Sequence, residues 1–281
     1  MNLLTNILYR MLYWLLGSLR TARMIRRLRS SDERAATALV NAIRQWKAGD
    51  YTDHETTWFR SIEQLRKNLL SDSTVVAITD FGAGSLTYAL SDEEMKQGKI
   101  VHRRIREICR SSANPKHWCR FLFSLVRQFR PERCLEFGTS LGISAAYLTA
   151  ACELNSKGRV ITLEGSESLS LRAMSNLNSL NLSRYEIVQG RFQESLPLVL
   201  QANAQIDFAF IDGHHDKHAT IQYFEQLQPH LHHTAIIVFD DISWSIGMRQ
   251  AWSAISKHPL VSYALDLFDM GICIVRKPDS R

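Results

Sequence analysis

Two different hydrophobic patterns divide the chain near residue 130. In the first part, apolar residues recur at helical spacing and predict helices at residues 31–48 and 116–129. Between them a further helix is marked by Trp58, Ile62, Leu65 and Leu69. Residues 30–33 (SSDE) resemble a capping box, Gly49 stops the first helix, and Pro131 ends the last one. The first part is therefore predicted to be mainly helical.

After residue 130, short apolar runs alternate with helical stretches. Five runs predict strands at residues 133–137, 160–164, 185–189, 208–212 and 235–240. Two more, at residues 262–267 and 271–276, predict an antiparallel hairpin at the edge of a sheet. Strands that alternate with helices of this length are typical of a doubly wound, mostly parallel sheet. The pattern predicts an α/β fold with seven strands and an amino-terminal helical extension.

Composition indicates the class of protein and its redox environment. The 281 residues are 45% hydrophobic and 22% charged, which is typical of a globular chain with a sizeable core. The five cysteines are odd in number, scattered and without CxxC spacing. This usage favours a reducing compartment and argues against structural zinc, so we expect a cytoplasmic protein.

The net charge of +6 is concentrated at the amino terminus. Residues 1–30 contain six arginines and no acidic residue, so the rest of the chain has equal numbers of basic and acidic side chains. A neutral main body argues against a general nucleic-acid-binding surface.

A basic amphipathic helix is predicted for residues 1–30. Its apolar positions recur at helical spacing: Leu4, Leu8, Met11, Leu15 and Leu19. Arg10 and Gly17 interrupt the apolar stretch, which is too short to span a bilayer and lacks the features of a signal peptide. Arginines beside an apolar face suit peripheral contact of residues 1–29 with the inner face of an anionic membrane. The alternative is a helix that packs on its own domain or on another subunit of a homo-oligomer.

Two glycine-containing stretches compete as the loop that binds a cofactor. They are residues 75–85 (VVAITDFGAGS) and 133–144 (RCLEFGTSLGIS), and each joins an apolar run, an acid and spaced glycines. A nucleoside also needs a carboxylate at the end of the next strand, and only the second stretch is followed by one, Glu164. The second stretch is therefore the predicted site. The DFGAGS segment of the first is either a lid over the active site or a plain turn.

Glu136 followed by Gly138-x-x-x-Gly142 resembles motif I of the class I S-adenosylmethionine (SAM)-dependent methyltransferases. The resemblance implies that SAM is the cofactor and that Glu164 binds its ribose. Phe192 follows the third strand, where this family contacts adenine, although it also suits the core. The implied SAM site comprises Glu136, Gly138, Ser140, Gly142, Ser144, Glu164, Gly190, Phe192 and Asp212.

FIDGHH at residues 210–215 and VFDDISW at residues 238–244 resemble the cation-dependent O-methyltransferases of the catechol and macrolide-sugar types. The resemblance covers roughly residues 60–281 and is closest to a bacterial group of largely uncharacterised methyltransferases. It implies that Asp212, Asp240 and Asp241 hold Mg²⁺ or another divalent cation, with Asp212 and His215 as catalytic residues. The catechol enzymes have Asp-Asn at the last pair and a lysine in place of the histidine, so this chain departs towards the sugar-modifying pattern.

A cation between these carboxylates suits the chemistry of methyl transfer to a hydroxyl. It polarises and orients the hydroxyl, while a histidine near its normal pKa takes the proton. Two plainer readings remain open: Asp240 and Asp241 cap a helix that starts at Ile242, and His215 is a solvated loop residue. The two aspartates reach one site only if the chain leaves strand geometry there.

We therefore expect a SAM-dependent O-methyltransferase that acts on a small-molecule hydroxyl, with a divalent cation and a histidine base. One alternative is a metal-independent methyltransferase of the same fold that acts on nitrogen or another acceptor. The other is an inactive, membrane-associated SAM-binding scaffold. The expected organisation is the basic helix at 1–30, a helical cap or lid region at 31–110 and a catalytic domain at 111–281.

Overall fold

The computed structural model describes residues 21–31, 33–81, 84–85, 88–89, 97–202 and 205–278. Most of the predicted amino-terminal helix lies outside these residues, but residues 21–29 are helical and are called helix 21–29 below. Gly82 and Ala83 of the DFGAGS segment also lie outside them. Among the helices that are described, none has the length and hydropathy needed to cross a bilayer.

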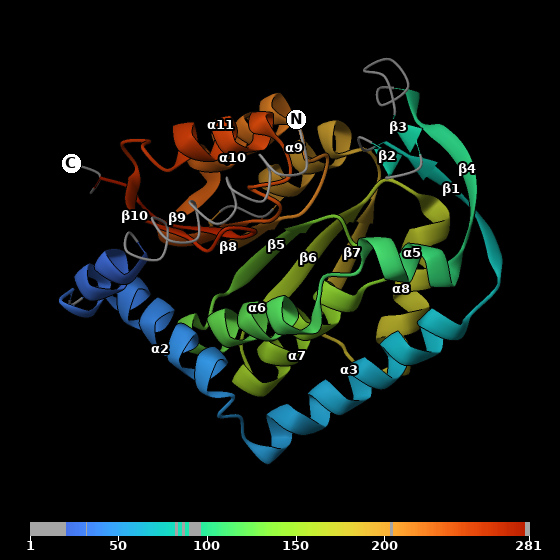
Figure 1. The fold of residues 1–281 in the computed structure, drawn as a ribbon, viewed down its shortest axis with the longest axis horizontal. Helices are drawn as coiled ribbons and strands as arrows, with labels where there is room; N and C mark the ends of the chain where they lie inside the picture. Colours follow the sequence, from blue (N-terminus) through green and yellow to red (C-terminus); the bar gives the residue numbers. More distant parts are fainter. Residues whose placement is uncertain are drawn as a thin grey trace, which may run out of the picture.

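A mostly parallel seven-stranded sheet forms the centre of the fold, as the hydrophobic pattern predicted (Figure 1). Its strand order is β10-β11-β9-β8-β5-β6-β7. The strands are β5 (Arg133–Phe137), β6 (Arg159–Glu164), β7 (Tyr185–Gln189), β8 (Ile206–Ile211), β9 (Leu231–Phe239), β10 (Val261–Asp266) and β11 (Gly271–Arg276). β10 and β11 pair antiparallel and form the predicted edge hairpin, which joins the sheet through the antiparallel pairing of β11 with β9.

Helices cover both faces of this sheet (Figure 1). One face carries α2 (Arg34–Ala48), α3 (Asp53–Ser71), α5 (Ile105–Ser112), α6 (Lys116–Phe129), α7 (Ile143–Asn155) and α8 (Glu167–Ser179). The other face carries α9 (Phe192–Ala202), α10 (Lys217–Leu227) and α11 (Ile246–Ile255), with the short helix η1 (Gln228–His230) before β9. The result is a three-layer α/β fold in which both faces of the sheet are buried.

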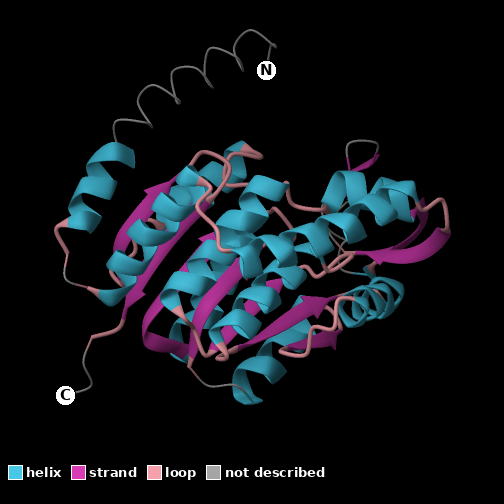
Figure 2. Ribbon diagram, turned by 90° about the horizontal axis from the view of Figure 1, so that it is seen from below, coloured by secondary structure: helices cyan, strands magenta, loops and turns pink. Residues whose placement is uncertain are grey.

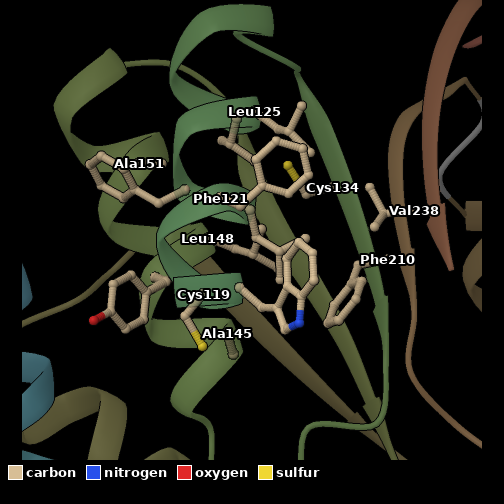
Figure 3. Packing of buried hydrophobic residues seen from close by; sticks show 14 of the residues in the cluster. Cys119, Phe121, Leu125, Cys134, Ala145, Leu148, Ala151, Phe210 and Val238 are labelled. Carbon is tan, nitrogen blue, oxygen red and sulfur yellow. The ribbon is translucent and has the colours of Figure 1, made fainter. Parts of the chain in front are cut away.

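The alternation of side chains along each strand divides the core in two. In β5, Cys134 packs with the first group of helices, whereas its neighbour Leu135 packs with the second group. Figure 3 shows part of the first core, where Phe121 and Leu125 of α6 lie among side chains of α7 and the sheet. Because both faces of the sheet are buried, the strands between the two cores are held in a single register.

The helix ends show which local signals worked. α6 spans the predicted residues, and Gly49 ends α2 as predicted, with its N–H donating to the Gln45 carbonyl oxygen over 2.9 Å in a left-handed conformation. The predicted capping box at residues 30–33 is wrong. α2 begins at Arg34 after Glu33, which makes no side-chain cap bond, and the Ser31 hydroxyl accepts from the Glu33 N–H instead.

A two-stranded antiparallel arm stands apart from the main sheet (Figure 1). It consists of β1 (Val75–Asp80) and β4 (Lys99–Arg104), and the described residues between them include the short pair β2 (Gly84–Ser85) and β3 (Tyr88–Ala89). The Thr79 N–H donates to the Ser166 hydroxyl over 3.3 Å, and the Ser168 hydroxyl donates to the Ala77 carbonyl oxygen over 2.6 Å. These bonds hold the end of β1 against the loop that follows β6.

Candidate active site

The sequence-predicted site residues gather where the parallel strands end. β5, β6, β8 and β9 pair in parallel, so their carboxyl ends lie on one edge of the sheet, called the carboxyl edge below. The main-chain N–H of Asp212 donates to the Phe137 carbonyl oxygen over 3.2 Å, and that of Asp240 donates to the Ile211 carbonyl oxygen over 3.0 Å. The loops after the three central strands are therefore joined side by side.

Gly138 fits this edge because it has no side chain. Its φ is +94°, and a Cβ there would lie 2.2 Å from the Asp212 carbonyl oxygen. The turn continues through Ser140 and Gly142, both left-handed, and Gly142 precedes the first residue of α7. Motif I is therefore a tight turn pressed against the strand that carries Asp212, and it opens a helix amino terminus.

Glu164 is held by main-chain donors. Its carboxylate accepts from the Ser140 N–H over 2.8 Å and from the Ser166 N–H over 2.9 Å. Burial raises the pKa of Glu164, and these N–H groups oppose the rise. Each oxygen keeps a further lone pair. Glu164 is thus oriented in advance and can still accept bonds from two ribose hydroxyls.

Glu136 is fully buried and only half satisfied. The Thr162 hydroxyl donates to its Oε2 over 2.6 Å, whereas its Oε1 is buried without a hydrogen-bond partner. Burial raises the pKa of this carboxyl to about 7, against the opposing effect of the Thr162 and Ser144 hydroxyls. An unpaired buried acceptor beside the motif I turn fits the ammonium group of the methionine moiety of SAM.

A cavity of about 200 Å³ opens beside these residues. It is lined by Ser140, Glu164, Gly165, Arg191, Phe192, His214 and the end of the arm, including Asp80 and Phe81. The Phe81 ring lies against Gly165, where a Cβ would be 2.7 Å from it, and the Arg191 guanidinium is 5.6 Å from its centroid. The described start of the DFGAGS segment therefore borders the cavity.

Gly190 and Phe192, the two predicted SAM-site residues that follow β7, have different surroundings. Gly190 is left-handed and its N–H donates to the Glu164 carbonyl oxygen over 2.9 Å, which ties the end of β7 to the end of β6. Phe192 is 9% exposed and packs edge-on against Phe137, with ring centroids 5.7 Å apart. Its ring is mainly part of the core, with one side on the cavity.

The second group of site residues is acidic and is called the acid cluster: Asp212, His215, Asp240 and Asp241. His215 lies between two of the carboxylates, with its Nε2 3.6 Å from Asp212 Oδ1 and its Nδ1 3.7 Å from Asp241 Oδ2. The Asn114 amide donates to Asp212 Oδ2 over 2.7 Å, and a hydrogen bond from the same residue lowers the pKa of Asp240. The two buried aspartates thus share one neutral donor.

Burial and electrostatic repulsion together set the pKa values in the acid cluster. Burial, and then the charges of Asp240 and Asp241, raise the pKa of Asp212 well above its usual value. Burial and Asp241 likewise raise the pKa of Asp240. Burial lowers the pKa of His215, although Asp241 opposes this, so the imidazole favours the neutral form that can accept a proton.

Left-handed backbone conformations bring the acid cluster together. Asp241, His214 and His215 have φ values of 52°, 61° and 44°. Such conformations cost non-glycine residues roughly 1–3 kcal/mol each, and they occur mainly where the surroundings or a function require them. At Asp241 the turn lets both aspartates reach one site. The helix-capping reading is wrong, because α11 begins at Ile246 and the Ser245 hydroxyl caps it by accepting from the Met248 N–H over 3.1 Å.

The donor set of the acid cluster suits a hard cation. Within the described residues, no group of three or more His, Cys, Asp or Glu meets the geometry needed to hold a metal ion. Nevertheless, three carboxylates converge here, and the contacts that Asp212 makes are with the Asn114 amide and with a histidine whose pKa is lowered. Neither group offsets the accumulated negative charge. Oxygen ligands of this kind are those that Mg²⁺ prefers.

Two residues of this region were missed by sequence reasoning. Asn114 lies 98 positions from Asp212, just before α6, where it reads as an ordinary helix-start residue. Phe81 lies at the end of the arm, in residues 75–85, the stretch that was not predicted to bind the cofactor. The two histidines also differ: His214 is fixed by a 2.6 Å hydrogen bond with the Tyr223 hydroxyl, whereas His215 faces the acids.

Comparisons with known proteins identify the family. A model described as a methyltransferase domain matches residues 135–242. The chain is similar to the solved O-methyltransferase from Bacillus cereus in complex with SAH, at 30% sequence identity over 59% of this chain and 83% of that one, with a TM-score of 0.52. It is also similar to cofactor-bound Rv0187 from MTB, at 25% identity over 59% and 83% of the two chains, with a TM-score of 0.53.

A third solved structure resembles the chain in fold alone. It is the O-methyltransferase TomG from Streptomyces achromogenes, involved in tomaymycin synthesis and solved with SAM. The identity is 21% over 59% of this chain and 83% of that one, and the TM-score is 0.50. Among curated proteins, none matches the chain.

Proposed function

The chain belongs to the SAM-dependent O-methyltransferases, and we propose that it methylates a hydroxyl of a small molecule with the help of a divalent cation and a histidine base. The observation that carries this proposal is the meeting of the motif I turn with the acid cluster, where Gly138 touches the backbone of Asp212. A methyl donor held by the turn and an acceptor held at the acid cluster would be neighbours. Proximity and orientation of this kind supply much of the catalysis of a transfer between two bound molecules.

The cofactor half of this proposal uses residues that are already oriented. SAM supplies a methyl group on a positively charged sulfonium, which is activated before it binds. Glu164 would accept from the ribose hydroxyls, and the orphan Oε1 of Glu136 would accept from the ammonium group. Ser140 and Ser144 line the same turn and would bond the methionine moiety, as the resemblance implies.

The acid cluster would bind the cation and the acceptor. Asp212, Asp240 and Asp241 are the proposed ligands, and a bound divalent cation would polarise the hydroxyl and favour its deprotonation. His215 would take the proton, because its pKa is lowered and its two ring nitrogens already face carboxylates. Asn114 would orient Asp212, as partners behind metal-binding residues commonly do.

A metal titration with an acceptor panel tests the proposal. Purified protein is stripped with EDTA, supplied with labelled SAM, and assayed with catechols, glycosides and other hydroxyl compounds while Mg²⁺ is restored. We expect turnover of at least one hydroxyl acceptor that disappears with EDTA and returns with Mg²⁺. Full turnover in excess EDTA would instead support the metal-independent alternative.

A further inference from the structure

The described chain begins at the same edge of the sheet as the acid cluster. The Thr21 hydroxyl donates to the Asp266 carbonyl oxygen over 2.8 Å. Asp266 ends β10 and pairs with Gly271, which pairs in turn with Phe239, the residue before Asp240. Thr21 therefore lies at the carboxyl edge, where the described part of the chain begins.

Helix 21–29 runs from this edge along the outside of the sheet (Figure 2). The Arg27 guanidinium lies 5.2 Å from the centre of the Tyr263 ring of β10, and Leu28 is 1% exposed in the core. The opposite face carries the exposed side chains of Arg23, Arg26 and Arg29. The helix thus uses its apolar residues to dock on its own domain and leaves a row of arginines free for another surface.

Two large apolar side chains are exposed at the same corner. Trp244 is 57% exposed and Ile246 is 70% exposed, and the Trp244 ring lies 6.3 Å from that of His215. Both residues lie near Thr21. Arg249 of α11, the helix that begins at Ile246, forms an ion pair at 3.2 Å with Asp266, the residue that Thr21 also contacts. Exposed tryptophan and isoleucine beside a site usually mark a contact with a partner.

We propose that this corner docks on an anionic lipid bilayer, with the solvent-exposed side of the acid cluster, at His215 and Asp241, facing the lipid. Helix 21–29 presents an exposed row of arginines, and Trp244 and Ile246 add exposed apolar side chains, which together are what such a surface binds. A second copy fits less well, since a two-fold contact centred on this corner would bring two rows of arginines together. Given the proposed function, the acceptor is then the hydroxyl of an amphiphile that reaches the site from the membrane.

Sedimentation of the full-length protein with vesicles tests the docking. The vesicles are phosphatidylcholine with or without a quarter of phosphatidylglycerol. We expect binding only to the anionic vesicles, weakened by salt because the charge term is screened. The variant Arg23→Gln/Arg26→Gln/Arg29→Gln should bind roughly 100-fold more weakly, as each arginine near an anionic surface contributes about fivefold.

The matched control is Arg44→Gln/Arg60→Gln/Lys67→Gln, which removes the same charge from exposed positions of α2 and α3. It should bind like the wild type. Equal losses in both triple variants would show a general charge effect and overturn the proposal. Absence of vesicle binding at low salt, with a concentration-dependent dimer by light scattering, would assign the corner to a second copy.

Brominated lipids test whether the exposed side of the acid cluster, next to Trp244, faces the bilayer. Bromine in the acyl chains quenches nearby tryptophan fluorescence, so Trp244→Phe should remove part of the quenching seen in the wild type. Ile246→Ser should weaken vesicle binding while affinity for S-adenosylhomocysteine (SAH) is retained. Quenching that is unchanged in Trp244→Phe would overturn the orientation. Vesicle binding requires neither metal nor turnover. Loss of vesicle binding therefore contradicts the docking proposal alone, and loss of turnover contradicts the proposed function alone.

Discussion

The two halves of the carboxyl edge treat their carboxylates in opposite ways. In the cofactor half, Glu164 receives two main-chain N–H groups and is oriented before any ligand arrives. In the acid cluster, burial and the charge of Asp241 raise the pKa of both Asp212 and Asp240, and both residues share the amide of Asn114. Glu164 is satisfied by the fold, whereas Asp212 and Asp240 are not, and Glu136 beside the motif I turn keeps one unpaired oxygen.

The backbone shows the same contrast. The motif I turn places glycines at two of its left-handed positions, Gly138 and Gly142, whereas His215 and Asp241 of the acid cluster are left-handed without being glycine. Buried carboxylates without a compensating charge destabilise a fold, and the cation of the proposed function would supply that charge. The cofactor half is preformed, and the acid cluster is completed by a cation under the proposed function.

The largest effect is expected from Asp241→Gly, which removes a carboxylate without strain because glycine tolerates φ of 52°. Turnover should fall by about 10³-fold or more, since a polarising cation is worth several kcal/mol, while SAH binds as before. Turnover assays and calorimetry with SAH measure the two effects. Asp241→Asn keeps one oxygen ligand and should retain more activity than the glycine variant. Loss of SAH affinity in Asp241→Gly would show that the halves are not independent.

An intermediate effect is expected from Glu164→Gln, which turns one acceptor of the Ser140 and Ser166 N–H groups into a clashing donor. Affinity for SAH should fall by roughly 1.5–3 kcal/mol, the usual value of a charged hydrogen bond, whereas Mg²⁺ binding should not change. Calorimetry with each ligand separates the two. Glu167→Gln, exposed at the start of α8, is the matched control and should bind SAH normally. An unchanged SAH affinity in Glu164→Gln would remove Glu164 from the site.

The smallest effect is expected on stability, at Glu136. Burial raises the pKa of Glu136 to about 7 in the folded protein, above its value in the unfolded chain. The folded state therefore holds the proton more tightly, and stability present below the unfolded pKa is lost as the pH rises through about 7.

Glu136→Gln should remove this loss and stabilise the ligand-free protein at pH 8 by on the order of 2 kcal/mol relative to its effect at pH 5. It should also weaken SAH binding, because the amide carries no negative charge and places its NH2 group at the Oε1 position when its oxygen keeps the bond from Thr162. Urea unfolding at the two pH values measures the first effect and calorimetry the second. The same stability difference at pH 5 and pH 8 would mean that Glu136 does not titrate in this range.

The hydrophobic pattern alone predicted the bounds of an element where a single helical or strand period ran along it. α6, β5, β7 and β11 span the residues that the hydrophobic pattern predicted, because each is a single apolar run closed by a clear stop signal. β9 starts at Leu231, which pairs with Ile206, rather than at residue 235, because the polar residues 232–234 interrupt the apolar run. Local signals failed at residues 30–33, where the capping pattern is present and helix α2 begins after it.

The sequence by itself determined the sheet, its edge hairpin and the list of carboxylates at the carboxyl edge, because parallel strands of a doubly wound sheet must end on the same side. Only the tertiary structure decided that Glu164 is satisfied while Asp212 is not, that Asn114 faces Asp212, and that Phe81 borders the cavity. The physical reason is that periodicity is local. Desolvation and electrostatic coupling instead depend on atoms brought together from distant positions, such as the 98 residues between Asn114 and Asp212.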